Sequence, residues 1–187
     1  MAVRDTARRK LTYEDYVLLP EDLLRHEILD GEHYVTPSPM KVHQSSSGNL
    51  FASLYLFVRA RELGTVLYAP FDVILSPNDI VQPDLLFISN ERAAILTEAN
   101  AQGAPDMVVE VLSNSTRRRD ETLKRDRYER FGVLEYWLVD PLRRTVRIFR
   151  RSGMGFAAPQ ELSAAAGDVL TTSLLPDFEM RVSNIFQ

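Results

Sequence analysis

The chain has 187 residues, of which 45% are apolar and 26% charged, and a formal net charge of −4. These proportions exclude a disordered chain, and no apolar run is long enough to cross a bilayer. The absence of cysteine excludes disulfides and zinc–thiolate sites and is compatible with a cytoplasmic protein. We therefore expect one domain over residues 1–187, with no signal peptide and no contact with a membrane.

The first expected elements are a short helix, a hairpin and a long helix. A suitable capping threonine precedes a helix over residues 13–18. An Asp-Gly pair, a strong two-residue turn signal, joins two short strands in a hairpin over residues 25–39. Apolar residues at helical spacing then predict a helix over residues 43–63, which Gly64 would end.

The remaining segments predict a mixture of strands and helices. The continuous apolar run at residues 104–113 is typical of a strand that is covered on both faces. With the helix and strand that follow, it resembles a βαβ unit with a right-handed crossover. We therefore predict an α/β or α+β fold with one mixed sheet. The expected strands are 65–76 (one or two), 81–89, 104–113, 133–141, an added hairpin at 145–162 and a short strand in the tail 167–186; the expected helices are 90–102, 116–132 and a last turn near residue 186.

Two carboxylates lie in strands that otherwise look buried. Asp84 precedes Leu-Leu-Phe-Ile, and Glu110 lies inside Val-Val-Glu-Val-Leu. Burial of an unpaired carboxylate is so unfavourable that such an acid needs a cation, hydrogen bonds or a proton. A solvated sheet edge or an arginine partner explains either acid alone. Two such acids on adjacent central strands indicate a shared site.

Two hard oxygen ligands suit Mg²⁺ or Mn²⁺, which keep several waters and take further ligands from substrate phosphate. The helix after the Glu110 strand can supply the cation of such a site. Asp120, Lys124 and Tyr128 recur every four residues and share one helix face. A helix that packs back on its parent strand would carry Lys124 over Glu110. The plainer interpretation is an exposed lysine paired with the aspartate four residues before it.

Four segments combine into a specific pattern: VQPDLLFIS, APDMVVEVLSNSTRRRD with the lysine and tyrosine that follow, GVLEYWLVDP, and LLPDFEMRVSNIF. This pattern resembles the Uma-type family of restriction endonucleases, a bacterial branch of the PD-(D/E)XK nuclease superfamily. The resemblance runs from the HEILDGEHYVTPSP hairpin to the C-terminus. It implies a restriction-endonuclease-like fold, in which helices flank a mixed central sheet that carries the metal site, with an N-terminal hairpin.

The resemblance also implies roles for individual residues. Asp84 matches the motif aspartate and Glu110 the motif acid, and both would bind the metal together with the backbone carbonyl of Val111. Leu112 occupies the usual lysine position, which departs from the superfamily pattern. In this family the lysine has moved to the helix, which points to Lys124.

Four further residues are possible members of the site. Glu27 and His43 match a recurrent glutamate and a recurrent histidine of the family. Either could bind a second metal or a metal-bound water, or orient the substrate. Asp72 is a further strand acid that could be an extra ligand, and Tyr128 lies on the same helix face as the lysine.

The arginine-rich stretch before the lysine could contact the phosphates of DNA through Arg117, Arg118 and Arg119. A solvated helix face explains the same charges. The net charge argues against a protein that only coats nucleic acid, but it leaves room for an enzyme with local basic patches. Trp137 is expected in the core or in a dimer interface.

The function expected from these observations is that of a Mg²⁺-dependent (or Mn²⁺-dependent) DNA endonuclease that hydrolyses phosphodiesters with a metal-activated water. A homodimer is expected because small nucleases that cut both strands often pair, here through the apolar region 135–149. One alternative is an inactive nucleic-acid-binding or assembly module on the nuclease scaffold. Another is a hydrolase that acts on RNA or a different phosphodiester.

Overall fold

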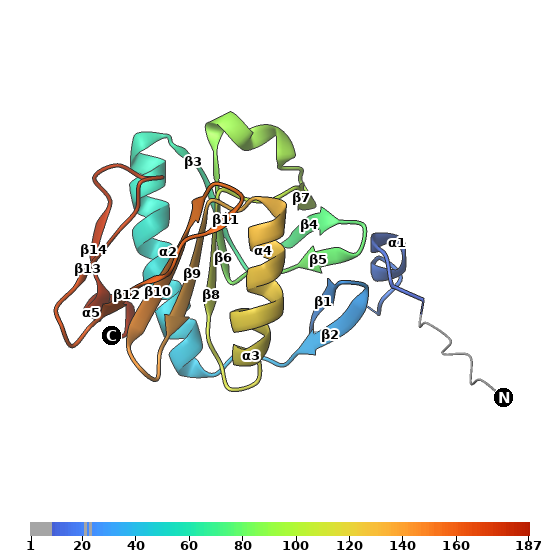
Figure 1. The fold of residues 1–187 in the computed structure, drawn as a ribbon, viewed down its shortest axis with the longest axis horizontal. Helices are drawn as coiled ribbons and strands as arrows, with labels where there is room; N and C mark the ends of the chain where they lie inside the picture. The colour runs from blue at the N-terminus through green and yellow to red at the C-terminus, as the bar shows by residue number, and fades with distance from the viewer. Residues whose placement is uncertain (1–8, 21, 23) are drawn as a thin grey trace.

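A mixed central sheet contains seven of the fourteen strands in the described residues, in the order β11-β10-β9-β8-β6-β3, with β12 beside β10 (Figure 1). The computed structural model describes residues 9–20, 22 and 24–187. The expectation about a signal peptide concerns the N-terminus, most of which lies outside the described residues. Strands β8 and β9 run parallel, and their other neighbours pair antiparallel. The strands are β3 (Gly64–Tyr68), β6 (Leu85–Ser89), β8 (Met107–Val111), β9 (Glu135–Asp140), β10 (Thr145–Ser152), β11 (Gly155–Phe156) and β12 (Gln160–Ser163).

A second sheet, in the order β2-β1-β5-β4-β7, contains the predicted N-terminal hairpin. The prediction of one mixed sheet is therefore wrong. The two halves of the segment 65–76 enter different sheets, because Pro70 between them has no N–H with which to continue a ladder. The strands are β1 (Arg25–Leu29), β2 (Glu32–Thr36), β4 (Asp72–Ser76), β5 (Asp79–Val81) and β7 (Asn100–Gln102).

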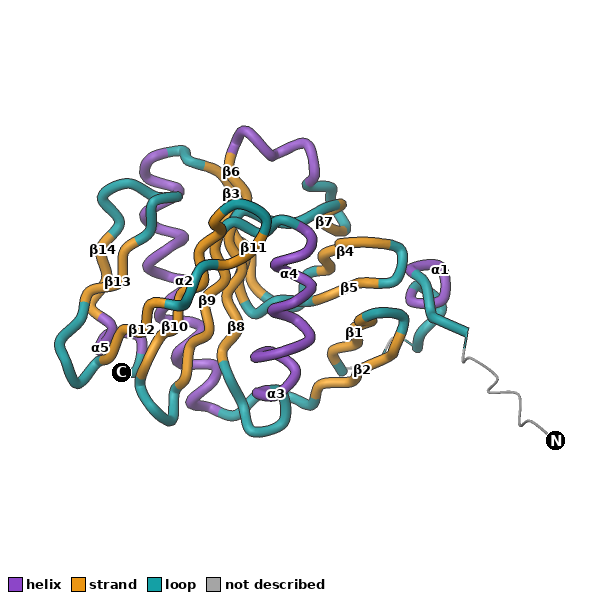
Figure 2. Tube along the Cα trace, in the orientation of Figure 1, coloured by secondary structure: helices purple, strands orange, loops and turns teal. Residues whose placement is uncertain are grey.

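The helices cover both faces of the central sheet, as the tube in Figure 2 shows. The predicted helix over residues 116–132 is a continuous rod whose middle is a π-helix. It ends, as predicted, at Gly132 in the left-handed conformation. The helices are α1 (Tyr13–Tyr16), α2 (Lys41–Arg61), the 3₁₀ helix η1 (Asn90–Ile95), α3 (Arg117–Arg119), the π-helix η2 (Asp120–Lys124), α4 (Arg125–Phe131) and α5 (Val182–Ile185). None of the helices in the described part of the chain has the length and apolar character to span a membrane.

Two local predictions need correction. The left-handed residue that ends α2 is Glu62, not Gly64. Gly64 begins β3 at a φ of 151°, where an added Cβ would lie 2.2 Å from the carbonyl oxygen of Ile88, so this position favours glycine for close strand approach. The helix expected over residues 90–102 stops at Ile95, because the Thr97 hydroxyl bonds the backbone of Asn100 and competes with the helix.

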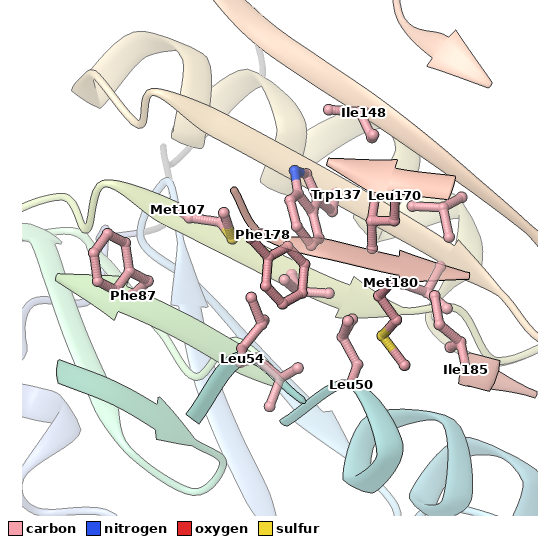
Figure 3. Packing of buried hydrophobic residues seen from close by; sticks show 14 of the residues in the cluster. Leu50, Leu54, Phe87, Met107, Trp137, Ile148, Leu170, Phe178, Met180 and Ile185 are labelled. Carbon is pink, nitrogen blue, oxygen red and sulfur yellow. The ribbon is translucent and has the colours of Figure 1, made fainter. Parts of the chain in front are cut away.

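The tail contains two strands where one was expected. Strands β13 (Val169–Thr171) and β14 (Glu179–Arg181) pair antiparallel as a separate two-stranded sheet. Their buried side chains, with those of α2 and α5, cover one face of the central sheet (Figure 3). Trp137 lies in this core and is fully buried, as predicted.

Strands β9 and β10, which contain the apolar region expected at a dimer interface, pair with each other within one chain. Every residue of β9 is buried. The β9 residues of the expected interface are therefore used inside the fold. The homodimer itself stays a prediction.

The alternation of side chains along β8 decides what the site can contain. Met107, Val109 and Val111 point into the core shown in Figure 3. Val108 and Leu112 point to the opposite face, toward a second core that includes side chains of α4. Glu110 shares the parity of that second set, so its carboxylate faces the helix that follows its own strand.

Candidate active site

Asp84 and Glu110 come together because their strands are neighbours. Strand β6 pairs antiparallel with β8, and Asp84 stands immediately before β6. The backbone N–H of Val111, next to Glu110, donates a 2.7 Å hydrogen bond to Asp84 Oδ2. Both carboxylates are almost completely buried. The two strand acids therefore share one enclosed site rather than a solvated sheet edge.

Lys124 points from the helix back to the sheet. Its Nζ lies 2.8 Å from Glu110 Oε1 and 2.6 Å from Glu27 Oε1, and the side chain has 0% exposure. Tyr128, one turn further on, donates a 2.8 Å hydrogen bond to the same oxygen of Glu110. Leu112 lies on the same strand face as Glu110. The structure thus places an amine over Glu110 although the strand itself contains no lysine.

Glu27 reaches the site from β1 and is fully buried. Its Oε1 accepts a 2.9 Å hydrogen bond from the backbone N–H of Gln82 in addition to the contact with Lys124. Arg119 lies 3.4 Å from Oε2, and this oxygen has no hydrogen-bond partner among the described residues. Glu27 is thus the second carboxylate that holds the lysine.

Asp84 has two cationic partners. Arg25 Nη1 lies 2.6 Å from Oδ1, and His43 Nε2, at the start of α2, lies 3.1 Å from Oδ2. Asp120 is also buried, with its Oδ1 3.9 Å from the nitrogen of Lys124, too far for a hydrogen bond. We call the following eight residues the charge cluster: Arg25, Glu27, His43, Asp84, Glu110, Arg119, Asp120 and Lys124.

Burial and neighbouring charge divide the carboxylates into two groups. Burial raises the pKa of Glu110 to about 8; Lys124 opposes this rise, and the nearby acids add to it. Burial also raises the pKa of Asp120. For Asp84 and Glu27, burial alone would raise the pKa, but the cations beside them hold it below its ordinary value. At neutral pH we therefore expect Glu27 and Asp84 ionised and Glu110 largely protonated.

The side chains of Lys124 and His43 keep their positive charge more readily in this site than in water. Burial would lower the pKa of Lys124, but Glu110 and Glu27 outweigh it and raise that pKa. Burial would likewise lower the pKa of His43, but its bond to the Asp84 carboxylate raises it. The charge cluster thus consists of ion pairs that are buried together rather than isolated charges.

Asp72 lies outside the charge cluster. It accepts 2.7 Å hydrogen bonds from the Tyr16 hydroxyl and from the side-chain amide of Gln82. Its link to Glu27 runs through Gln82, whose backbone N–H bonds that glutamate. We therefore interpret Asp72 as a residue that positions Gln82.

The three consecutive arginines have different surroundings. Arg117 forms two hydrogen bonds, of 2.7 and 3.0 Å, with the buried carboxylate of Asp140 at the end of β9. Arg119 lies against Glu27 and donates to the Thr36 hydroxyl. Arg118 is exposed and has no ion pair within the described chain. Of the three, Arg118 is thus the one that is free to meet a phosphate.

We predict opposite effects for two of these arginines. Arg117→Met should lower the free energy of unfolding by about 1–3 kcal/mol, because it leaves buried Asp140 without its closest charged partner. Arg118→Met should leave stability within about 0.5 kcal/mol but reduce the salt dependence of DNA binding by about one counterion. Urea denaturation and binding measured over a salt series check both expectations. A loss of stability in Arg118→Met alone would contradict the assignment.

The donor set of the charge cluster fits a hard divalent cation. Glu27 Oε2 and Asp120 Oδ1 are buried oxygens without hydrogen-bond partners. Glu110 accepts the hydrogen bonds of Lys124 and Tyr128 on Oε1, which leaves Oε2 available. Three or more such side chains do not converge as a ready set of ligands anywhere in the described residues. This is compatible with Mg²⁺, which needs only one or two carboxylates.

Sequence reasoning missed Arg25 and did not assign a role to Asp120. Arg25 and Glu27 are two residues apart on β1, so strand periodicity alone places both on one face. A cation two positions before a buried acid was therefore the available signal. Asp120 was placed on the correct helix face, but only the packed helix shows that it is buried beside Lys124.

The chain is similar to known proteins in its sequence and in its fold. The sequence model of the family described as "Uma2: Putative restriction endonuclease" matches residues 13–183. Five chains of solved structures also match. One is the 1.96 Å crystal structure of "a putative nuclease belonging to DUF820" from Anabaena variabilis ATCC 29413. It is 16% identical with a TM-score of 0.80, over 94% of this chain and 97% of that one, which shows a shared fold. No curated protein matches the chain.

Proposed function

Because the chain belongs to the family described as "Uma2: Putative restriction endonuclease", we propose that it is a Mg²⁺-dependent endonuclease that hydrolyses phosphodiester bonds of DNA. The observation that supports this proposal most directly is the contact of Lys124 with Glu110. Asp84 lies beside this pair, immediately before the adjacent strand β6. Two acids on neighbouring strands and one buried amine form a set that suits phosphate chemistry. The family and the fold support this proposal at the level of a nuclease.

In the proposed site, Asp84 and Glu110 would hold the divalent cation together with the backbone carbonyl of Val111. Bound Mg²⁺ would act as a Lewis acid toward the phosphate and lower the pKa of water. Glu110 must lose its proton before it can act as a ligand, because burial keeps it largely protonated at neutral pH.

The other side chains of the charge cluster have supporting roles in this proposal. Lys124 keeps its positive charge in a dry environment, where it can stabilise negative charge that develops on the phosphate. Glu27 holds Lys124 from the opposite side, and Tyr128 fixes the Glu110 carboxylate by its hydroxyl. His43 orients Asp84 through Oδ2.

The direct test is DNA cleavage by purified protein with Mg²⁺ or Mn²⁺. We expect plasmid nicking or linearisation that EDTA abolishes and that Asp84→Asn reduces by at least about 100-fold. Asp126→Asn, which changes an exposed aspartate on α4, is the matched control and should cleave like wild type. Equal cleavage by wild type and Asp84→Asn would identify a contaminant and contradict the proposal. Single-stranded DNA and RNA substrates in the same assay define the substrate class.

One observation favours a second candidate, a nucleic-acid-binding or assembly module without catalysis. The four carboxylates of the charge cluster already face the cations Arg25, Arg119 and Lys124 and the His43 imidazole. These cations already compensate the ionised carboxylates of Glu27 and Asp84 without an added metal, while Glu110 is largely protonated. Calorimetric titration separates the candidates, because Mn²⁺ binding that Glu110→Gln abolishes supports the enzyme, and no binding supports the module.

A further inference from the structure

Arg25 is a cation of the charge cluster that the proposed mechanism does not use. Its side chain is 18% exposed, and its Nη1 lies 2.6 Å from Asp84 Oδ1. Its charge also acts on Glu27 and Glu110. The guanidinium thus lies among the three acids that contact or neighbour the proposed cation position.

The two oxygens of Asp84 are not equivalent. Oδ2 accepts one hydrogen bond from the backbone N–H of Val111 and lies against His43, so the fold fixes it on two sides. Oδ1 is contacted by Arg25 alone among the partners of this carboxylate. Oδ1 is therefore the oxygen that a divalent cation would use, and Arg25 already holds it.

The guanidinium of Arg25 has donors to spare. An arginine carries five N–H donors in a fixed fork that matches a phosphate. The structure shows one hydrogen bond from Arg25, and its buried Nε has no partner within the described residues. A mainly buried arginine with an unused donor, beside acids that suit a metal, fits an anion that comes from outside the chain.

We propose that Arg25 and the divalent cation compete for Asp84 Oδ1, and that Arg25, when displaced, binds the phosphate of the DNA that is cut. This inference rests on the proposed nuclease function. A divalent cation and a guanidinium on one oxygen repel each other. The arginine therefore opposes cation binding until a phosphate offers it a replacement anion, which couples metal binding to substrate binding.

The test measures Mn²⁺ affinity by calorimetry without DNA. Arg25→Met removes the competing charge and should bind Mn²⁺ at least about tenfold more tightly than wild type, while Arg25→Lys should stay within about threefold of wild type. With saturating Mn²⁺, Arg25→Met should cleave DNA at least about 100-fold more slowly. Arg25→Gln is a second neutral variant for the same measurement if the methionine variant does not fold.

Arg127→Met is the matched control, because Arg127 is a partly buried arginine outside the charge cluster that pairs with the carboxylate of Asp79 instead of Asp84. Its Mn²⁺ affinity should change by less than about threefold. That result excludes general charge removal as the cause of a gain in Arg25→Met. Equal or weaker Mn²⁺ binding by Arg25→Met, or an equal gain in Arg127→Met, overturns the competition. If Glu110→Gln leaves wild-type Mn²⁺ binding unchanged, the proposed function itself fails and this inference fails with it.

Discussion

Lys124→Met is expected to lower the free energy of unfolding by about 3–5 kcal/mol and DNA cleavage by about 100-fold to 1,000-fold. Lys124 is fully buried and contacts both Glu27 and Glu110. Without the ammonium group, the ionised carboxylate of Glu27 loses its closest cation in an environment that water does not reach. The same change removes the charge that we assign to phosphate stabilisation.

Urea denaturation and single-turnover cleavage measure these two effects separately. Lys10→Met is the matched control, since Lys10 is an exposed lysine that pairs with the exposed carboxylate of Asp30. It should change stability by less than about 1 kcal/mol, as surface ion pairs usually contribute little. A Lys124→Met protein as stable as wild type would contradict the assignment of Lys124 as the charge that holds Glu27.

Glu110→Gln is expected to abolish Mn²⁺ binding and cleavage while it preserves or raises stability in EDTA. The pKa of Glu110 is raised from 4.5 to about 8, so a neutral glutamine resembles the protonated form that the folded protein prefers. Lys124 keeps Glu27 as its ionised partner at 2.6 Å. Loss of function without loss of stability would identify Glu110 as a residue that is kept for chemistry.

The stability difference between Glu110→Gln and wild type should depend on pH. Between pH 4.5 and about 8, the unfolded wild-type chain has released the Glu110 proton and the folded protein has kept it. Wild-type stability therefore falls as pH rises through this window, by up to about 1.4 kcal/mol per pH unit. The variant lacks this contribution. Its stability relative to wild type should rise from pH 5 to 8 and level off above, and a flat difference would show that Glu110 is ionised in the fold.

Local sequence signals predicted the parts of the site that lie within one strand–helix unit. The sequence showed Glu110 as a lone acid in an apolar strand, and Lys124 and Tyr128 four residues apart on the next helix. In the structure, Lys124 and Tyr128 both contact Glu110. The Asp-Gly turn and the helix over residues 116–132 were predictable for the same reason. Each depends on backbone preferences and periodicity over a few neighbouring residues.

Partner choice over long sequence distances was not predictable. Arg25 pairs with Asp84, 59 residues away, and Arg117 pairs with Asp140, 23 residues away. A run of three arginines looks uniform in the sequence, but tertiary packing gives each a different partner. The prediction of one mixed sheet was wrong for the same reason. Pairings between strands that are distant in the sequence, such as that of β1 with β5, decide which sheet a strand joins.

The sequence by itself determined that a carboxylate would be buried in β8 and that a lysine would follow on one face of a helix, because apolar alternation and helical spacing are local properties. Only the tertiary structure decided that Glu27, Asp84 and Asp120 share that burial and that Arg25 holds Asp84. Charges that are far apart in the chain meet when the second sheet, which contains β1 and β5, and the helical segment α3–η2–α4 pack over β8. In that dry volume, the partner that each carboxylate finds determines whether it is ionised or protonated.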